Sequence, residues 1–532
     1  MKRFVFILLL PIWLFCQVPD LTTHILMRDE TTLPTDFYFP DTENRAHLPT
    51  VLIRSPSGRK SEFLKPFLNL TKAGYLVVVQ STRNVEDPKG RTFPFLTDGW
   101  GEQQDGYDTL EWLSKSGYTN GKVGTAGVSA MGITQLLLAP TAHPSLAFQH
   151  IGFAPASLYH HAIFRSGQVY KSQVEGWLGF YAPDPGVHSF VINQPFFNEF
   201  WKQFDTTTVS GRVQTPALFI AGWYDTFLNG TLSAFQSRQN EGGKGARGKQ
   251  RLVIGPWTHF WPKSMHFGDF EIPPLGNQPP IDISPKPWFD FYLKGIENSI
   301  TKAPPVTYFV MGPFDGTPSS GNVWKSSDVW PPKSKSTPFY LTKDHTLTLE
   351  DPVEGSVSFT YDPCDPAPTL GGRNLFLESG PKDQRPIEMR EDVLVFTSET
   401  LTRDLEVTGQ LSLKLLTTSD QDDTDIAVRL TDVYPDGKSI LVSDGIFRIG
   451  HDFCIGKAVS PIGCDVTIDL GPTSMVFAKG HKIRLSVTGS NYPRFEKNLN
   501  IGVVGGDCGA VSQAETTIHI GSDSALILPI VE

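Results

Sequence analysis

The chain has 532 residues, which is too long for one hydrophobic core and predicts two or three domains. Its 39% hydrophobic, 19% charged and 11% aromatic residues predict a globular protein with well-filled cores and an apolar pocket. The net charge of −10, with no basic cluster interleaved with aromatics, argues against a nucleic-acid partner.

Residues 1–16 are typical of a secretory signal peptide. The start MKRFVFILLLPIWLFC has a short basic end and then an apolar run, which is shorter than the ~20 residues of a membrane span. An uncleaved anchor is the alternative. Glycosylation sequons begin at Asn69 and Asn229, although the second lies beside a candidate catalytic residue described below. We expect a protein without a stable membrane span, secreted or held in a lumenal, lysosome-like compartment.

The cysteines agree with export. Beyond the signal, the chain has Cys364, Cys454, Cys464 and Cys508, an even number that allows three pairings. The short loop from Cys454 to Cys464 makes that disulfide the easiest to form, which leaves Cys364 to pair with Cys508. Four buried thiols are the alternative, and they would require a reducing compartment.

The next part of the chain alternates strands and helices. In residues 17–154, TVLIRS and YLVVVQS are apolar on both faces, as buried parallel strands are, and DGYDTLEWLSKSG is an amphipathic helix. Residues 155–213 interrupt this pattern with aromatic and polar residues and predict a helical insertion. The alternation resumes over residues 214–303. These segments predict a mostly parallel, doubly wound sheet with an inserted helical cap.

Residues 304–532 have a different character. Short alternating strands such as LSLKLLTTS and HKIRLSVTG are separated by turn signals, among them the Pro-Asp-Gly of DVYPDGKSILVSD. This pattern predicts an antiparallel β-sandwich. The acidic run DQDDTD lacks the spacing of a calcium-binding loop, and we identify no metal or cofactor site.

Three apolar strands each stop abruptly and present one reactive side chain. GKVGTAGVSAMG presents Ser129, PALFIAGWYDTF presents Asp225, and RLVIGPWTHF presents His259. Serine is a nucleophile only when a base removes its proton, and an acidic side chain can orient that base. The order Ser, Asp, His along the chain is that of α/β-hydrolases. The three segments together therefore predict a Ser-His-Asp triad.

Each of these residues has a simpler explanation when it is taken alone. The usual Gly two residues after the nucleophile is replaced by Met131, and Gly132 follows one position later, so Ser129 fits the general motif imperfectly. Asp225 could cap the following helix, and His259 could be an ordinary core or surface histidine. His266 is the alternative base. The triad is favoured over these separate explanations only because three strands, in the expected chain order, each end at a residue of the type that a triad needs.

The chain resembles the family of α/β-hydrolases that includes bacterial cocaine esterase and the X-Pro dipeptidyl-peptidases. The resembling segments, which span nearly everything after residue 50, are IRSPSGR, DGYDTLEWL, NGKVGTAGVSAMGITQ, AGWYDTF, IGPWTHF, WFDFYLKGIEN, YDPCDPAPTLGG, DVYPDGKSILVSDGIFR and SNYPRFEKNLN. The resemblance implies an α/β-hydrolase core, an inserted helical cap and a C-terminal jelly roll. It also implies Ser129 as nucleophile, His259 as base and Asp225 as the residue that orients it.

The resemblance implies a site that stabilises the oxyanion with two hydrogen-bond donors, and this chain differs from the family at both positions. The backbone N–H of Ala130 is the first donor, although the family favours an aromatic residue there. The family's second donor is a tyrosine where this chain has Ser57, whose side chain is too short to reach the same point. Either Ser57 acts through water, another donor replaces it, or turnover is slow, because losing one donor costs about a hundred- to thousandfold.

The implied substrate pocket is apolar. The resemblance lines it with Phe227 and with Leu375 and Phe376 of the jelly roll, although plain core packing explains Leu375 equally well. Thr226 and Phe227 follow Asp225 where amino-acid ester hydrolases of this group have acidic residues. We therefore expect a cofactor-independent serine esterase for small acyl esters, with amide or peptide-like substrates less favoured. The alternatives are an X-Pro-type dipeptidyl peptidase and a weakly active hydrolase fold that serves as a binding module.

Overall fold

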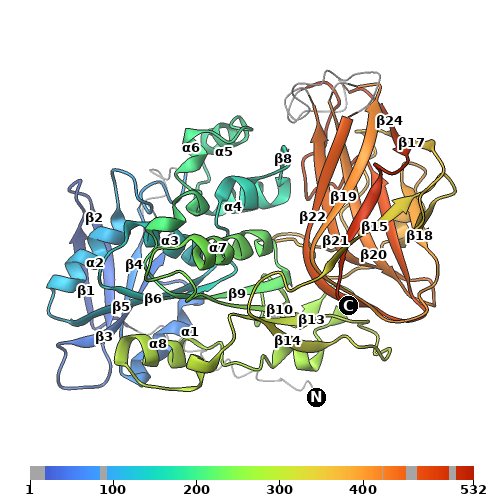
Figure 1. Ribbon diagram of the computed structural model, residues 1–532. Helices are drawn as coiled ribbons and strands as arrows, with labels where there is room; N and C mark the ends of the chain where they lie inside the picture. The colour runs from blue at the N-terminus through green and yellow to red at the C-terminus, as the bar shows by residue number, and fades with distance from the viewer. Residues whose placement is uncertain (1–17, 84, 86–92, 422, 451–463, 503–510) are drawn as a thin grey trace, which may run out of the picture.

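The computed structural model describes residues 18–83, 85, 93–421, 423–450, 464–502 and 511–532. Figure 1 shows an α/β core, a group of helices above it, and a β-sandwich beside both. The predicted signal peptide, residues 1–16, lies outside the described residues. In the part of the chain that is described, no helix combines the length and the apolar character needed to cross a bilayer.

The core is built on one mixed sheet. Within the described residues its strands run, from edge to edge, in the order β1 (Leu21–Leu26), β2 (Thr32–Tyr38), β4 (Leu76–Ser81), β3 (Leu48–Ser55), β5 (Thr119–Val128), β6 (Leu146–Gly152), β9 (Ala217–Tyr224), β10 (Arg251–Thr258), β13 (Val306–Val310) and β14 (Val323–Ser327). Pairing is parallel from β4 to β13 and antiparallel at both edges. The central strands are apolar on both faces because helices cover both faces.

Figure 1 shows α2, α3 and α7 on one face of this sheet and α1 and α8 on the other. The helical segments of the core are α1 (Lys65–Leu68), α2 (Asp105–Lys115), α3 (Ala130–Leu138), α7 (Leu228–Glu241) and α8 (Pro285–Lys294), with short turns η1 (Glu62–Leu64), η2 (Asn69–Ala73), η4 (Ala139–Thr141), η6 (Thr206–Arg212), η7 (Pro274–Asn277) and η8 (Ser299–Lys302). Between them, β11 (His266–Phe267) and β12 (Phe270–Glu271) form a small hairpin. This arrangement confirms the predicted doubly wound core.

The cap leaves the core after β6 and returns before β9. Its elements are the π-helical turn η5 (Tyr159–Ile163), the small hairpin β7 (Phe164–Arg165) and β8 (Gln168–Val169), and helices α4 (Lys171–Tyr181), α5 (Pro185–Ile192) and α6 (Glu199–Lys202). The two ends of this insertion are joined by backbone hydrogen bonds, from Leu158 N–H to the Phe204 carbonyl at 3.3 Å and from Thr206 N–H to the Ala156 carbonyl at 2.9 Å. The cap is therefore closed at its base.

The C-terminal part is a β-sandwich. Its strands are β15 (Lys335–Leu341), β16 (Thr346–Thr348), β17 (Gly355–Tyr361), β18 (Leu394–Ser398), β19 (Leu405–Ser419), β20 (Thr424–Val433), β21 (Ser439–Ile449), β22 (Cys464–Phe477), β23 (Lys482–Thr488), β24 (Ala514–Ile520) and β25 (Ala525–Ile530), with the short helix α9 (Arg385–Glu388). The pairs are antiparallel except for β16 with β18. Alternating burial along β19 matches the alternating sequence pattern.

One expected boundary differs from the structure. From the sequence pattern, residues 304–532 are predicted to form the sandwich, whereas β13 and β14 belong to the core sheet. All five residues of β13 are buried, because this strand pairs in parallel with β10 and is covered on both faces. Beyond β13, Met311 bridges to Met475 of β22, so the last core strand leads directly onto the sandwich.

The cysteine pairing is not tested. Cys454 and Cys508 lie outside the described residues, while Cys364 is exposed and Cys464 is half-buried at the start of β22. Of the two sequons, Asn69 is exposed, and Asn229 is half-buried in α7 and donates to Asp469 Oδ2 at 3.3 Å. Both disulfides and glycosylation therefore remain predictions.

Candidate active site

The nucleophile candidate lies in a tight strand-to-helix turn. Ser129 follows the last residue of β5 and precedes the first residue of α3, with φ 56° and ψ −124°. Its N–H donates to the Gly152 carbonyl of β6 at 2.9 Å. A positive φ is a strained conformation for a residue other than glycine. In a strand-to-helix turn of this kind, that conformation directs the serine hydroxyl away from the end of the sheet.

Two glycines make this turn possible, and they explain the imperfect motif. Gly127 has φ 155°, and a Cβ there would lie 2.4 Å from the Met131 Cβ. A Cβ on Gly132 would lie 2.6 Å from the Ala154 Cβ and 3.2 Å from the Gly152 carbonyl. The close approach of α3 to β6 thus falls at Gly132, and Met131 is accommodated because Gly127 leaves room for it.

The structure brings the three predicted residues into one line of hydrogen bonds. His259, one residue past β10, has its Nε2 at 3.0 Å from Ser129 Oγ and its Nδ1 at 2.6 Å from Asp225 Oδ1. Asp225 follows β9 by one residue and is fully buried, and its other oxygen accepts from the Phe227 N–H at 3.2 Å. His266, the alternative base, is exposed in the β11–β12 hairpin.

The strand that precedes Asp225 is contacted from the sandwich. Arg373 is buried, and its Nε donates to the Trp223 carbonyl of β9 at 3.0 Å while its Nη1 donates to the Leu470 carbonyl at 3.1 Å. Next along β9, the Tyr224 hydroxyl donates to the Leu441 carbonyl at 2.7 Å. The strand that presents Asp225 is therefore fixed by two contacts that the core sheet does not supply.

The imidazole is surrounded by aromatic rings. The ring centroids of Phe227 and Phe153 lie 5.4 Å and 6.0 Å from that of His259, both edge-on. Phe227 is the predicted pocket residue, whereas Phe153 escaped the sequence analysis because its position just past β6 carries no distinctive motif. These rings give the site an apolar wall on the side of its base.

The two predicted jelly-roll residues have different surroundings. Leu375 is 8% exposed and belongs to the hydrophobic core cluster, as its simpler explanation expects. Phe376 is 49% exposed and packs on the cap, where a Cβ added to Gly176 of α4 would lie 2.5 Å from its ring. The sandwich therefore meets the cap through Phe376.

The two candidate donors to the oxyanion, Ala130 and Ser57, lie just beyond the ends of the neighbouring strands β5 and β3. Ala130 opens α3, so its N–H is one of those that a first helical turn leaves without an intrahelical acceptor. Ser57 lies two residues past β3, and its Oγ is 3.2 Å from the hydroxyl of Tyr181, the last residue of α4. Tyr181 was not predicted from the sequence, although its spacing of four residues from Trp177 would place both aromatic residues on one face of a helix.

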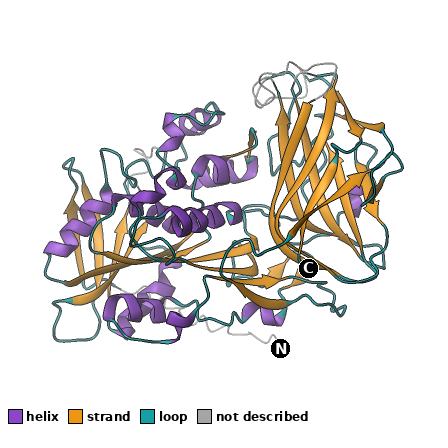
Figure 2. Cartoon of the chain, in the orientation of Figure 1, coloured by secondary structure: helices purple, strands orange, loops and turns teal. Residues whose placement is uncertain are grey.

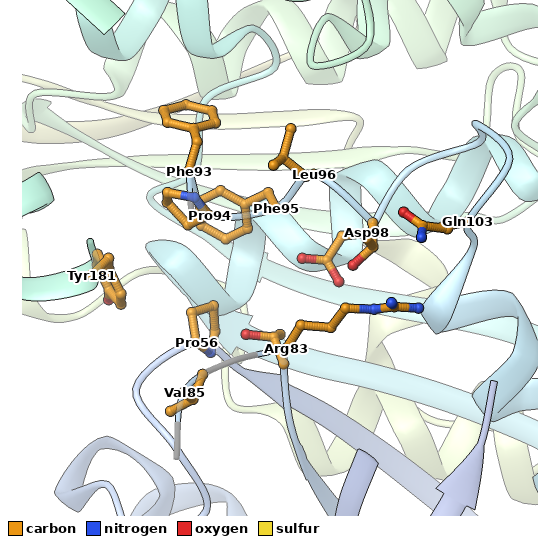
Figure 3. A pocket seen from close by; sticks show the side chains of 12 residues that line it. Pro56, Arg83, Val85, Phe93, Pro94, Phe95, Leu96, Asp98, Gln103 and Tyr181 are labelled. Carbon is orange, nitrogen blue, oxygen red and sulfur yellow. The ribbon is translucent and has the colours of Figure 1, made fainter. Parts of the chain in front are cut away.

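A cavity of about 240 Å³ lies behind this contact. Figure 3 shows Tyr181 and Pro56 at one end, Phe93, Pro94 and Phe95 along one side, and Arg83 with Gln103 at the far end. No triad residue is among its described lining residues. Of its lining residues, Tyr181 contacts Ser57 and Pro56 directly precedes it.

Comparisons with known proteins agree with the architecture. Residues 29–182 and 170–261 match the model of the X-Pro dipeptidyl-peptidase (S15) family, and residues 298–526 match that of the X-Pro dipeptidyl-peptidase C-terminal non-catalytic domain. The cocaine esterase of Rhodococcus sp. (strain MB1 Bresler) is 30% identical, over 95% of this chain and 97% of that protein.

Two solved structures share the fold over nearly the whole chain. An aminopeptidase from a marine sediment Thaumarchaeota archaeon superposes with a TM-score of 0.77 at 22% identity, covering 97% of this chain and 99% of the other. A CocE/NonD family hydrolase from Staphylococcus aureus superposes with a TM-score of 0.71 at 21% identity, covering 96% and 93%.

Proposed function

This chain belongs to the family of cocaine esterase and the X-Pro dipeptidyl-peptidases, and from that premise we propose that it is a serine esterase that cleaves small acyl esters through an acyl-enzyme. The observation that carries the proposal is the hydrogen-bonded line from Ser129 through His259 to Asp225. Its chemistry requires neither a metal nor a cofactor, because the side chains supply nucleophile, base and counter-charge.

In the first half of the reaction, His259 Nε2 accepts the proton of Ser129 Oγ as that oxygen attacks the ester carbonyl. The carbonyl oxygen becomes negatively charged and accepts the Ala130 N–H. The C–O bond to the alcohol then breaks, and the imidazolium returns the proton to the departing oxygen. Asp225 keeps its charge throughout and stabilises the imidazolium through the 2.6 Å contact.

In the second half, water takes the place of the alcohol. His259 removes one of its protons, the water oxygen attacks the acyl carbonyl, and the bond to Ser129 Oγ breaks. Ser129 recovers its proton from the imidazolium and the carboxylic acid leaves. The same three side chains thus serve both halves of the reaction.

The aromatic rings around His259 favour an apolar acyl group. Phe227 and Phe153 border His259 with rings that carry no hydrogen-bonding group. The residues directly after Asp225 are Thr226 and Phe227, and the Thr226 hydroxyl is already bonded to the Gln173 side chain of α4. This position therefore lacks a carboxylate that would hold a substrate amine, which favours an esterase over a dipeptidyl peptidase.

The test is a fluorophosphonate probe together with a substrate panel. The purified protein should be labelled covalently, and Ser129→Ala should lose both the label and the turnover of p-nitrophenyl acyl esters while remaining folded. Gly-Pro-anilide run beside the esters distinguishes the peptidase. Faster cleavage of the anilide would reject the esterase assignment, and an unlabelled, inactive wild-type protein would favour a binding module.

We also propose that the protein is exported and carries the Cys454–Cys464 disulfide. The proposal rests on the basic and apolar character of residues 1–16 and on the short loop between the two cysteines. Peptide mapping without reduction of protein secreted by expressing cells should recover the two cysteines in one linked peptide pair. Alkylation of both thiols in native secreted protein would reject it.

A further inference from the structure

The reaction needs a second donor for the oxyanion. A tetrahedral intermediate places a full negative charge on one oxygen, and α/β-hydrolases stabilise it from two sides. One side is the N–H after the nucleophile, here that of Ala130. The other comes from the loop that follows the neighbouring strand β3. In this chain that loop contains Ser57.

The strand register brings this loop beside the nucleophile. β3 and β5 are parallel neighbours, with Leu52 opposite Thr125, so that the ends of the two strands are level. The Thr134 hydroxyl of α3 donates to the Arg54 carbonyl at 3.1 Å, which joins the helix behind the nucleophile to the end of β3. Ser57 and Ser129 therefore leave the same edge of the sheet side by side.

The loop is tightly turned, which fixes where Ser57 points. The Gly58 N–H donates to the Ser55 carbonyl at 3.2 Å, and the Ser55 hydroxyl donates to the Gly58 carbonyl at 2.9 Å. Gly58 has φ 83°, a conformation that favours glycine. Ser57 is thus held at the tip of a closed turn, directed toward the cap.

The only hydroxyl that Ser57 contacts among the described residues is that of Tyr181, at 3.2 Å. Two hydroxyl groups in one hydrogen bond use a single hydrogen between them, so one O–H remains to donate elsewhere. A phenol is a stronger acid than an aliphatic alcohol and hence the better donor to an anion. The arrangement with the Ser57 hydroxyl donating leaves the phenolic hydrogen available.

The ring of Tyr181 is fixed by its neighbours on α4 and in the core. Its centroid lies 5.4 Å from that of Trp177, whose ring stacks in turn on Phe95 at 5.6 Å. Burial raises the pKa of the Tyr181 hydroxyl above its ordinary value, against the smaller opposing effect of the Ser57 hydrogen bond. The phenol therefore keeps its proton at neutral pH and remains a donor. Figure 3 shows the ring beside Pro56, the residue before Ser57.

We propose that the Tyr181 hydroxyl is the second oxyanion donor of this enzyme and that Ser57 is the residue that positions it. The inference rests on the proposed esterase function and assigns a catalytic role to the cap, since α4 carries the donor. The O–H bond of Tyr181 stays intact through the reaction. Its hydrogen bond to the carbonyl oxygen strengthens as charge develops there.

The simpler explanation is that Tyr181 only packs the cap against the core. Tyr159 offers a control, because it is a second tyrosine of the cap, itself buried, and its hydroxyl donates to the Pro195 carbonyl, away from Ser57. Replacing either tyrosine with phenylalanine removes one hydroxyl and leaves the ring. A packing role would make the two variants behave alike, whereas an oxyanion role would separate them.

The experiment compares Tyr181→Phe, Tyr159→Phe and Ser57→Ala in ester hydrolysis. We expect Tyr181→Phe to lower kcat about a hundredfold with KM changed less than about threefold, because the lost bond forms only in the transition state. Ser57→Ala should lower kcat about tenfold, and Tyr159→Phe should leave it within about twofold. All three should unfold cooperatively, as judged by circular dichroism.

A second readout separates charge stabilisation from packing. An alkyl boronic acid forms a tetrahedral adduct with the serine and reports on affinity for the transition-state geometry, while the product carboxylic acid reports on ordinary binding. For Tyr181→Phe the boronic acid affinity should fall by about the same factor as kcat/KM, and the product affinity should not change.

Two outcomes would overturn the proposal, an unchanged kcat in Tyr181→Phe or an equal loss in Tyr159→Phe. Both presuppose that the wild type hydrolyses esters, as the esterase assignment requires. Failure of that assignment has a different signature, namely ester turnover or phosphonate labelling that survives Ser129→Ala.

Discussion

The core side and the cap side of the candidate site are specified in different ways. On the core side, the turn around Ser129 is determined by residues within a few positions of it, because Gly127 and Gly132 supply the space that the turn needs. On the cap side, α4 contributes Tyr181 and Gly176, whose partners Ser57 and Phe376 lie far away in sequence. A local motif encodes the first side, whereas tertiary packing encodes the second.

This difference predicts that substitutions on the two sides fail differently. A change at the turn displaces the nucleophile itself and should reduce kcat whatever the substrate. A change where α4 meets the sandwich, away from the Tyr181 hydroxyl, alters how these two parts pack together, so it should affect binding and vary with the size of the substrate.

Ser129→Ala should have the largest effect, a loss of at least about ten-thousandfold in kcat, because the covalent step disappears while the oxyanion site remains. Ester hydrolysis under saturating substrate measures it, and the melting temperature should change little. Substantial residual turnover by this variant would show that the core side does not carry the chemistry.

Gly127→Ala should come second. A Cβ there lies 2.4 Å from the Met131 Cβ at φ 155°, so the turn must shift, and a displacement of about 1 Å at the reacting atom costs about a hundredfold in kcat/KM. Gly121→Ala is the matched control in the same strand, since it also has a positive φ, 89°, but contacts nothing. It should lose about 1 kcal/mol of stability and keep its kcat/KM. Equal activity losses in both variants would contradict a local role for the turn.

Gly176→Ala should have a moderate and substrate-dependent effect. The added Cβ would press on the Phe376 ring at 2.5 Å, and because that side chain is half exposed it can move, which changes the junction of cap and sandwich. We expect KM to change about three- to tenfold for bulky acyl esters and much less for acetyl esters. Gly179→Ala, on the same helix with nothing within 4 Å, should only stabilise the helix by up to about 1 kcal/mol. A kcat effect independent of acyl size would remove the distinction between the two sides.

The last prediction concerns stability rather than activity, namely the pH dependence of the cap. Burial, with a smaller contribution from His160, lowers the pKa of His161 to about 4, below its ordinary value of 6.5. The neutral form is favoured in the folded protein, so this stabilisation is present above pH 6.5 and is lost as the pH falls toward 4. Between pH 7 and 4.5 the wild type should lose about 2 kcal/mol more stability than His161→Gln. Parallel denaturation curves for the two proteins at both pH values would show that His161 titrates normally.

The core and the meeting of Ser129, His259 and Asp225 could be predicted because their signals are local. Strands that are apolar on both faces indicate a parallel sheet with helices packed on both of its faces. Ser129, Asp225 and His259 each directly follow such a strand. In parallel neighbours these ends meet at one edge, so chain order and strand ends were sufficient to place the three residues together. The antiparallel sandwich followed in the same way from alternating strands.

Other features required the folded structure. The strands β13 and β14 look like sandwich strands in sequence, because periodicity shows that a segment is a strand but not which sheet it joins. The contact of Tyr181 with Ser57 joins residues 124 positions apart, and no pattern within either segment points to the other. The predicted departure at Ser57 was visible in the sequence, whereas the residue facing it was not.

The closed base of the cap has a consequence for how this protein could be modified. The backbone bonds at Leu158 and Thr206 hold the entry and exit of the insertion together, so the length of chain between them adds little to the cost of folding the core. Residues 158–204 therefore resemble a replaceable cassette, which could be exchanged to alter substrate choice without changing the triad. If Tyr181 donates to the oxyanion, a substitute cassette must bring its own hydroxyl to Ser57, and one that does not would bind esters yet turn them over slowly.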